Sequence, residues 1–416
     1  MTTSVIRAGG TGVAGVQTTG GDDGALSLKV GPLSTTVEAL SITSAGAATL
    51  ASTLAVTGDL TANNFAGRNK IIGGDFTTNP WQRGTSFAAI ANAAYFADRW
   101  KVGHSTGAVV TASKAADAPT AAQAGTFTQH CLSLAVTTAD TSIAAGDYFF
   151  THQTIEGLNA ASFGFGQAGT RYVTLSFWVK GTKTGIHCVA LVNSANNRTY
   201  VAEYTINSTN TWEYKTITIP VDTTGTWLYT NGAGIDVRFS LASGSTFQTS
   251  ADTWAAGNFL ATSNQVNALD STSNIFKIAL VQLEAGSVAT TFDARSVGTE
   301  LALCQRYLYK LEADTADKGM GLVGQAYGTT ASILPFVFPV TPRTKVTGIT
   351  ISGATDFSLT VAASSRQATT GLTFGAAFPN GVWLTGSVGA NLAAGDAVTL
   401  WSAVDDAFIL FTGAEL

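Results

Sequence analysis

Two groups of large aromatic residues stand beside polar residues in this sequence, as they do on sugar-binding surfaces. Flat aromatic faces stack on the C–H groups of a sugar, while amide, hydroxyl and carboxylate groups bond its hydroxyls. The first group lies on the polar face of an alternating segment, and the second lies in and near the segment GTWLYTNG. The two groups are Tyr172 and Trp178, and Trp227, Tyr229, Asn231, Trp254 and Asn258.

The same aromatics have a purely structural interpretation. Aromatic residues are enriched at protein interfaces, so these side chains would equally seal a subunit contact or close the edge of a β-sandwich. Trp81, Trp100 and Trp212 are expected in the core.

Two identical dipeptides, His130-Cys131 and His187-Cys188, raise the question of a metal site. Two His and two Cys on neighbouring strands would approach a tetrahedral zinc set. Adjacent residues of a strand point to opposite faces, however, so each dipeptide offers only one side chain to a given face. A buried Cys beside an outward His is therefore the expectation, with no metal and no cofactor.

Hydrolysis of a polysaccharide requires two carboxylates about 5 to 9.5 Å apart across a sugar cleft. The acidic candidates Glu156, Glu203, Asp236 and Glu284 are scattered singly along the chain. No long repeat typical of a β-helical depolymerase occurs either. The sequence therefore predicts a protein that is not an enzyme.

The elements that would position these residues are short strands separated by turn residues. Their spacing indicates an antiparallel sandwich with jelly-roll-like connections. Eight strands are expected at Gln129–Val136, Asp147–Ile155, Tyr172–Lys180, Gly185–Val192, Thr199–Ile206, Trp212–Pro220, Ile235–Leu241 and Ile275–Leu283.

The segment Tyr172–Lys180 shows the alternation best. Its odd-numbered residues Val173, Leu175, Phe177 and Val179 form one apolar face, which belongs in the core. Only Glu284–Lys310 favours a short helix, because Leu301, Cys304 and Leu308 recur at helical spacing. From Leu322 to Leu416 the pattern is again β-like and predicts a second, smaller β-domain.

A different pattern precedes the sandwich, in the segment Leu40 to Ala66. From Leu40 to Asn63 its bulky apolar residues all have even numbers, which predicts an extended ribbon with one apolar face. Because such a ribbon cannot cover that face alone, we expect three copies to wind around a common axis as a fibre shaft. The predicted core of this trimeric shaft is Leu40, Ile42, Leu50, Leu54, Val56 and Leu60.

Composition supports an all-β, permanently assembled protein. The 416 residues are 45% hydrophobic and only 12% charged, and the chain contains 44 glycines. No aromatic residue precedes Phe65, so an ordinary core begins after a boundary near Gly67. The expected domains are an attachment segment at 1–30, a trimeric shaft at 31–67, a jelly roll at 68–296 and a C-terminal β-domain at 297–416.

The charge pattern excludes several classes of function. A net charge of −5 without a basic cluster argues against nucleic-acid binding. No apolar run is long enough to cross a bilayer, and the N-terminus lacks the apolar core of a secretory signal. Three well-separated cysteines, Cys131, Cys188 and Cys304, indicate synthesis in a reducing cytoplasm rather than a disulfide framework.

A series of motifs resembles phage tail-fibre and related virion proteins that carry a carbohydrate-binding-module-like jelly roll. The motifs, in order, are NPWQRGTSF, YFADRW, QTIEGL, LSFWVK, VQLEAGSVATTFDARS and ELALCQRYLYK, with GAEL at the end. The likeness covers roughly residues 69 to 310, and its motifs are framework elements, so no binding residue is transferred from them.

The resemblance implies a homotrimeric virion fibre, made in the host cytoplasm and located in the tail. Residues 1 to about 30 would attach to other tail or baseplate proteins, and the β-domains would recognise a host-surface glycan. Two alternatives stay open. One is a purely structural head, collar or connector fibre, and the other is a surface-polysaccharide hydrolase.

Overall fold

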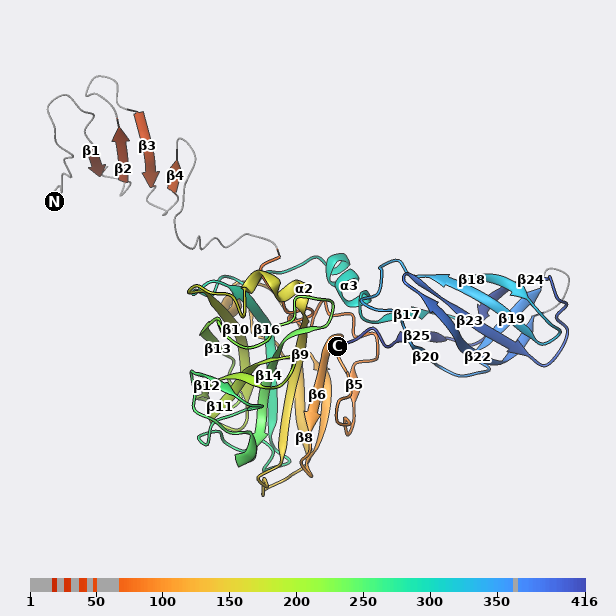
Figure 1. Ribbon diagram of the computed structural model, residues 1–416, viewed down its shortest axis with the longest axis horizontal. Coiled ribbons are helices and arrows are strands. Elements are labelled where there is room, and N and C mark those ends of the chain that lie inside the picture. The colour runs from red at the N-terminus through yellow and green to blue at the C-terminus, as the bar shows by residue number, and fades with distance from the viewer. Residues whose placement is uncertain (1–16, 21–25, 31–36, 43–47, 51–66, 362–365) are drawn as a thin grey trace. The chain divides into compact units, whose positions relative to one another are not determined.

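A computed structural model describes residues 17–20, 26–30, 37–42, 48–50, 67–361 and 366–416. The chain separates into two compact units, Met1–Thr61 and Ala62–Leu416. The described residues are almost entirely strands and turns, which confirms the all-β prediction (Figure 1). No helix among them is long and apolar enough to span a membrane.

The first unit contains a four-stranded antiparallel sheet in which each strand pairs with the next. Its register sets Leu40 opposite both Leu28 and Leu50, and Ile42 opposite Leu26. The strand partners of residues 40–42 and 48–50 therefore come from the same chain, whereas the sequence interpretation supplied partners only from sister chains. Predicted shaft residues Leu54, Val56 and Leu60 lie outside the described residues. The strands are β1 (Gln17–Gly20), β2 (Leu26–Val30), β3 (Val37–Ile42) and β4 (Ala48–Leu50).

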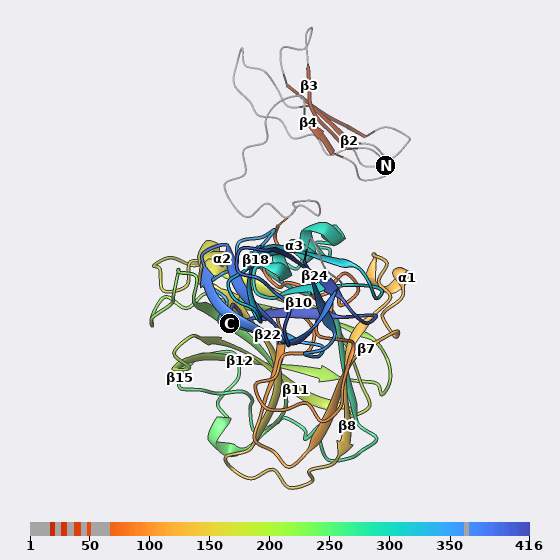
Figure 2. The same ribbon diagram turned by 90° about the vertical axis from the view of Figure 1, so that its right-hand side faces the viewer.

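The second unit begins with a β-sandwich of two antiparallel six-stranded sheets, with the crossing connections of a jelly roll. Figure 2 shows β7 and β8 of one sheet on the right and β12 and β15 of the other on the left. The first sheet has the order β13 (Glu213–Pro220), β10 (Tyr172–Gly181), β16 (Ile275–Ala285), β8 (Cys131–Thr138), β7 (Val109–Ala115) and β5 (Ser86–Phe87). The second sheet has the order β15 (Trp254–Ala256), β12 (Arg198–Ile206), β11 (Gly185–Asn193), β14 (Ala233–Ser243), β9 (Tyr148–Glu156) and β6 (Trp100–His104).

Alternation along each strand builds the core between the sheets. Val173, Leu175, Phe177 and Val179 of β10 are fully buried in this core, as predicted. Trp100 is completely buried there too, and Trp81 nearly so. All eight strands expected in the sandwich occur within two residues of their predicted bounds.

The C-terminal part of the same unit is a closed six-stranded barrel with a three-stranded sheet at its base. The barrel has its own core, which includes the buried Phe357, Leu359, Leu384 and Leu400. Its strand order is β18 (Gly319–Ala326), β19 (Ala331–Val337), β23 (Gly381–Val388), β22 (Gln367–Phe378), β21 (Phe357–Val361) and β24 (Ala397–Ser402). The small sheet has the order β17 (Tyr309–Glu312), β25 (Phe408–Thr412) and β20 (Gly348–Ile351).

The expected short helix is present as α3 (Val297–Gln305), which begins at the N-cap Ser296. The expectation of a single helical segment was wrong, because two further helical turns connect strands. They are α1 (Ala121–Ala124), closed by a capping box between Thr120 and Gln123, and α2 (Gly157–Ala160). Four-residue helices lack the repeated apolar spacing by which a sequence predicts a helix. Two 3₁₀ turns, Ala161–Phe163 and Ser245–Phe247, complete the helical elements of the described residues.

Two of the quoted motifs, QTIEGL and NPWQRGTSF, are each hydrogen-bonded to a third, ELALCQRYLYK. Glu156 of QTIEGL accepts hydrogen bonds from Arg306 at 2.6 and 2.9 Å and from the Tyr307 hydroxyl at 2.7 Å. Gln82 of NPWQRG donates to the Leu308 carbonyl at 2.9 Å and accepts from the Lys310 amide at 2.9 Å. These contacts join the end of β9 and the segment before β5 to the end of α3 and to β17, so these three motifs serve the framework.

Candidate functional site

The outer face of β10 presents the polar residues of the alternating segment, together with two aromatics. Thr174 and Ser176 are buried on this face, Trp178 is partly buried, and Tyr172 is 39% exposed at the end of the strand. Tyr172 lies opposite Pro220, whereas Trp178 lies opposite Tyr214. The strand therefore keeps the two predicted aromatics apart, and Trp178 lines a cavity that Tyr172 does not reach.

Trp178 forms a cross-strand pair with Tyr214 of β13. Their ring centroids are 5.5 Å apart with an angle of 41° between the planes, and Tyr214 is 45% exposed. Tyr214 was not among the predicted site residues. The sequence offered Tyr214 as an aromatic two residues after Trp212 in an expected strand, but the pairing of that strand with β10 is seen only in the structure.

The pair lines a cavity of about 300 Å³ on the outside of the first sheet. One wall comes from α1, which lies beside β7 in Figure 2, and another comes from the segment after β16. The lining residues are Gln123, Ala124, Ser176, Trp178, Tyr214, Leu280, Ala289, Thr290, Thr291 and Phe292. Aromatic faces with hydroxyl and amide groups around them are what a sugar-binding cavity requires.

A β-bulge in β16 shapes the floor of this cavity. The register between β10 and β16 shifts between Ser176 and Trp178, and Leu280 adopts a positive φ of 50° within the strand. Bulges re-aim side chains and occur often beside functional sites. A leucine in the left-handed region is strained, so the local backbone is held by its surroundings.

A compact charge cluster lies along the same outer face, beyond Trp178. Lys180 Nζ lies 3.0 Å from both carboxylate oxygens of Asp117, and Lys277 contacts the same carboxylate at 2.5 Å. Burial alone would raise the pKa of Asp117, but the two ammonium groups outweigh that effect and lower it. Lys180 also lies over the ring of Trp212, 6.0 Å from its centroid. Trp212 is buried, as expected, but in a small cluster on this outer face rather than between the two sheets.

The tryptophans of the second predicted group are packed against neighbouring aromatic rings. Trp227 is buried in the core, where its ring lies 4.5 Å from Phe165 and 5.5 Å from Trp254. The indole N–H groups of Trp227 and Trp254 donate to the carbonyls of Thr224 and Pro220. This placement corrects the expectation that Trp227 presents an exposed face, because neighbouring rings cover it.

The remaining members of that group form hydrogen bonds within the chain. The Tyr229 hydroxyl donates to the Phe165 carbonyl, and Asn231 donates to the Arg343 carbonyl at 3.1 Å. Asn258 accepts a hydrogen bond of 2.8 Å from Arg238 on the outside of the second sheet. The sequence placed these residues in one loop-rich region, but the fold distributes them among three different contacts.

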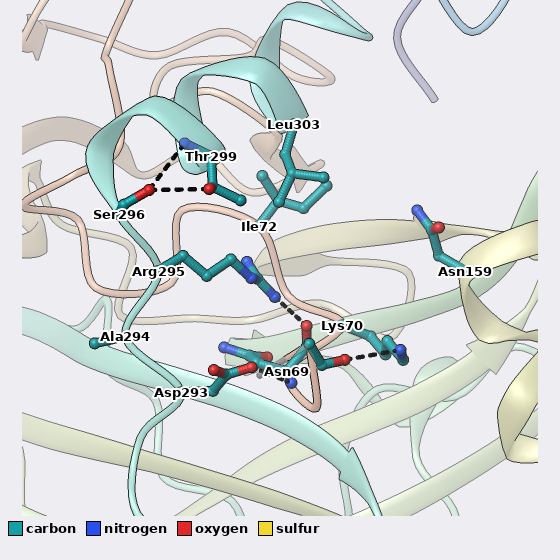
Figure 3. Close-up of a pocket in the computed structure, with 11 residues that line it drawn as sticks. Asn69, Lys70, Ile72, Asn159, Asp293, Ala294, Arg295, Ser296, Thr299 and Leu303 are labelled. Carbon is teal, nitrogen blue, oxygen red and sulfur yellow. Dashed lines mark hydrogen bonds between the residues drawn. The ribbon is translucent and has the colours of Figure 1, made fainter. Parts of the chain in front are cut away.

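A larger cavity of about 410 Å³ lies beside the N-terminal end of α3 (Figure 3). Its polar groups are largely satisfied within the chain. Arg295 donates to the carbonyls of Asn69 and Ile71, and Ser296 and Thr299 bond each other at 2.9 Å. Because none of the described residues that line this cavity is aromatic, it matches a sugar less well than the Trp178 cavity.

The two His-Cys dipeptides lie on different sheets, with Cys131 on β8 and His187-Cys188 on β11. All three cysteines are fully buried. The prediction of an outward His was wrong for His187, which is 1% exposed and stacks on Tyr204 with ring centroids 5.8 Å apart. Both faces of this strand are covered, so alternation does not expose either residue. Among the described residues, no group of three or more His, Cys, Asp or Glu is placed to hold a metal ion.

The four acidic candidates each have separate partners. Asp236 bonds His152 at 2.7 Å and Arg238 at 2.8 Å, and Glu156 is held by Arg306 and Tyr307. Glu284 accepts from the Thr290 hydroxyl at 2.7 Å, and Glu203 accepts from Asn264 at 2.9 Å beside an open polar hollow. None of these contacts joins two of the four carboxylates.

No protein-family model and no curated protein matches this chain. Among solved structures, it is similar to the enzymatically active domain of tailspike protein 4 of bacteriophage CBA120, at 15% identity and a TM-score of 0.29, over 53% of this chain and 22% of that chain. It is also similar to a family 11 carbohydrate-binding module of Clostridium thermocellum, at 14% identity and a TM-score of 0.25, over 48% of this chain and 95% of that chain. A third similar structure is TmCBM61 in complex with β-1,4-galactotriose, at 13% identity and a TM-score of 0.26, over 53% of this chain and 99% of that chain.

Proposed function

We propose that this chain is a homotrimeric virion fibre protein whose β-sandwich binds a glycan of the host surface without cleaving it. The observation that carries the proposal is the Trp178–Tyr214 pair in a cavity bordered by hydroxyl and amide groups. A sugar ring stacked on Trp178 would find hydrogen-bond partners on Ser176, Gln123 and Thr290.

Binding is tested on purified surface polysaccharides of candidate bacterial hosts, with affinity measured by calorimetry or interferometry. Trp178→Ala removes the stacking face and is expected to weaken binding at least about tenfold, which corresponds to about 1.4 kcal/mol. Trp178→Phe should recover part of that loss. Tyr172→Ala is the matched control, because Tyr172 is an exposed aromatic on the same face of the same strand but lies outside the cavity.

The outcome separates the proposed function from its two alternatives. Absence of binding to every host polysaccharide would favour a structural fibre without receptor function. Equal losses in Trp178→Ala and Tyr172→Ala would also contradict the proposed site. Release of new reducing ends from the polysaccharide would favour a hydrolase instead.

The trimer is a separate part of the proposal and depends on the N-terminal ribbon. Light scattering is expected to give three times the chain mass of 42.8 kDa. Val56→Asp would bring three carboxylates together on the shaft axis, where unpaired buried charge is strongly unfavourable. A trimer that persists unchanged in this variant would refute the shaft, whereas Thr57→Asp, on the polar parity of the ribbon, should leave it intact.

Attachment to the virion is proposed for residues 1 to about 30, with other tail or baseplate proteins as partners. Removing these residues should abolish incorporation into particles while leaving polysaccharide binding intact. Loss of both properties together would contradict this division of roles.

A further inference from the structure

The barrel has no charged residue in any of its six strands. Asp, Glu, Lys and Arg are absent from β18, β19, β21, β22, β23 and β24. Charged residues of this region stand in the connections, such as Asp356, Asp396 and Asp405. The strands of the sandwich differ, since they carry Lys101, Lys180 and other charges.

Large apolar side chains gather on one side of this uncharged wall. Val323 is 60% exposed, Ile333 39%, Val337 61% and Trp383 49%. They lie on β18, β19 and β23, which are consecutive neighbours in the barrel. We call Val323, Ile333, Pro335, Val337 and Trp383 the barrel face.

The register shows that the barrel face is continuous. Pro335 lies opposite Trp383, and Gln325, next but one to Val323, lies opposite Ile333. The alternate residues Leu334, Val382 and Leu384 are fully buried in the barrel core. Alternation therefore directs one set of apolar residues inward and leaves the second set in solvent.

Another outward tryptophan of the barrel is covered by its own chain. The guanidinium of Arg366 lies over the ring of Trp401, 4.4 Å from its centroid, and Arg366 is paired with Asp317. Trp383 makes an edge-to-face contact with Phe378, with ring centroids 6.5 Å apart, and stays half exposed. Contiguous exposed apolar patches of this kind mark interaction sites.

We propose that the barrel face is a self-association surface, whose occupant is the same face of another copy of this chain. Around a symmetry axis identical residues converge, so a charged residue there would face its own copies and repel them. A wall without charges avoids that repulsion. A sugar would instead require polar groups around Trp383, but its direct neighbours on the two adjoining strands are Pro335 and Ala376.

This contact goes beyond the proposed ribbon trimer, because it lies in the second unit and uses different residues. It would hold neighbouring barrels together even if the N-terminal ribbon alone set the number of copies.

Cysteine cross-linking in the full chain tests the contact. The native Cys131, Cys188 and Cys304 are buried, so an introduced surface cysteine is the accessible thiol. Ile333→Cys is placed on the barrel face, and Val404→Cys is its control in the turn after β24. The two positions are matched, since Ile333 is 39% and Val404 40% exposed.

With a short bis-maleimide, Ile333→Cys is expected to give covalent dimers and higher species at least about tenfold faster than Val404→Cys, because contact raises the effective thiol concentration. Adding Trp383→Lys to Ile333→Cys should remove this advantage. Equal rates at the two positions, or no cross-linking at Ile333→Cys, would overturn the proposal.

Light scattering on the same samples separates the two assembly proposals. A trimeric mass without cross-linking at Ile333→Cys would reject the barrel contact and leave the ribbon trimer in place. A monomeric mass at all concentrations would reject both. Weaker polysaccharide binding by Trp383→Ala, without cross-linking at Ile333→Cys, would reject self-association in favour of a sugar platform.

Discussion

Arg99 lies directly over the ring of Tyr307, with its guanidinium carbon 3.6 Å from the ring centroid. Arg99 is 2% exposed, and its Nε and Nη1 atoms have no hydrogen-bond partner in the described part of the chain. Its Nη2 donates to the carbonyl of Thr154. The aromatic face is therefore the main partner of a buried positive charge, which is a cation–π interaction in a desolvated place.

Replacing Tyr307 separates the role of its ring from that of its hydroxyl. Tyr307→Phe keeps the ring but removes a donor to the buried Glu156, so the free energy of unfolding should fall by about 1–2 kcal/mol. Tyr307→Leu also leaves the Arg99 charge uncompensated, and a loss of about 3–5 kcal/mol is expected. Urea unfolding measures both, with Tyr214→Phe at an exposed position as the control. Similar losses for the two Tyr307 variants would contradict the role assigned to the ring.

Asp98 should make stability depend on pH. Burial raises the pKa of Asp98 to about 6, against the opposing effects of its hydrogen bonds to Gln82 and of Arg83. A carboxyl whose pKa is higher in the folded state favours folding when protonated, so its contribution is present below about pH 4 and is lost as the pH rises through 6. The free energy of unfolding of the wild type, relative to Asp98→Asn, should therefore fall by up to about 3 kcal/mol between pH 4 and pH 7. Parallel pH profiles for the two proteins would show that Asp98 does not titrate in this way.

The positive φ of Leu280 predicts that replacement by glycine and replacement by alanine differ in their effect on stability. Both Leu280→Ala and Leu280→Gly remove a buried side chain, but only glycine adopts φ near 50° without steric cost. Leu280→Gly should therefore be more stable than Leu280→Ala by about 1 kcal/mol, the reverse of the usual order within a strand. Thermal unfolding compares them. A more stable alanine variant would indicate that the bulge relaxes when the side chain is lost.

Position 157 in the QTIEGL motif requires a glycine, because the backbone of another segment lies close to its Cα atom. A Cβ atom at this position would lie 2.3 Å from the Leu228 carbonyl oxygen and 2.7 Å from that of Thr230. Gly157→Ala should cost more than about 2 kcal/mol, since backbone must move to admit the methyl group. Gly298→Ala in α3 is the control, because its Cβ meets nothing within 4 Å and alanine favours a helix. Equal stability of the two variants would show that the backbone of residues 228–230 can shift at little cost in free energy.

The sequence predicted those strands in which apolar and polar residues alternate regularly. Tyr172–Lys180 was placed correctly, face by face, because the inward residues of β10 meet the core at a strict period of two. The same rule located eight of the twelve strands of the sandwich. Among the strands that it missed are β6 (Trp100–His104), where a glycine interrupts a short pattern, and β22 (Gln367–Phe378), where Gly and Ala replace bulky residues.

The candidate site was predictable only in part, because it depends on contacts between distant segments. Outward alternation identified Trp178, but nothing in the local pattern indicated that α1 and Phe292 would wall a cavity around it. Trp227 appeared to belong to a loop, whereas Phe165 and Trp254 cover it from other parts of the chain. The prediction that His187 points outward was wrong for the same reason. A strand whose two faces are both covered does not alternate between core and solvent.

The position of β16 in its sheet has a consequence for synthesis on the ribosome. This strand is the last of its sheet in the chain, yet it lies in the interior between β10 and β8. Until Ile275–Ala285 has been translated, the earlier strands have two unfilled edges facing each other across the gap. A nascent chain paused before that point would offer both edges to neighbouring polypeptides on the same polysome, so slow decoding upstream of residue 275 should promote aggregation, and fast decoding should suppress it.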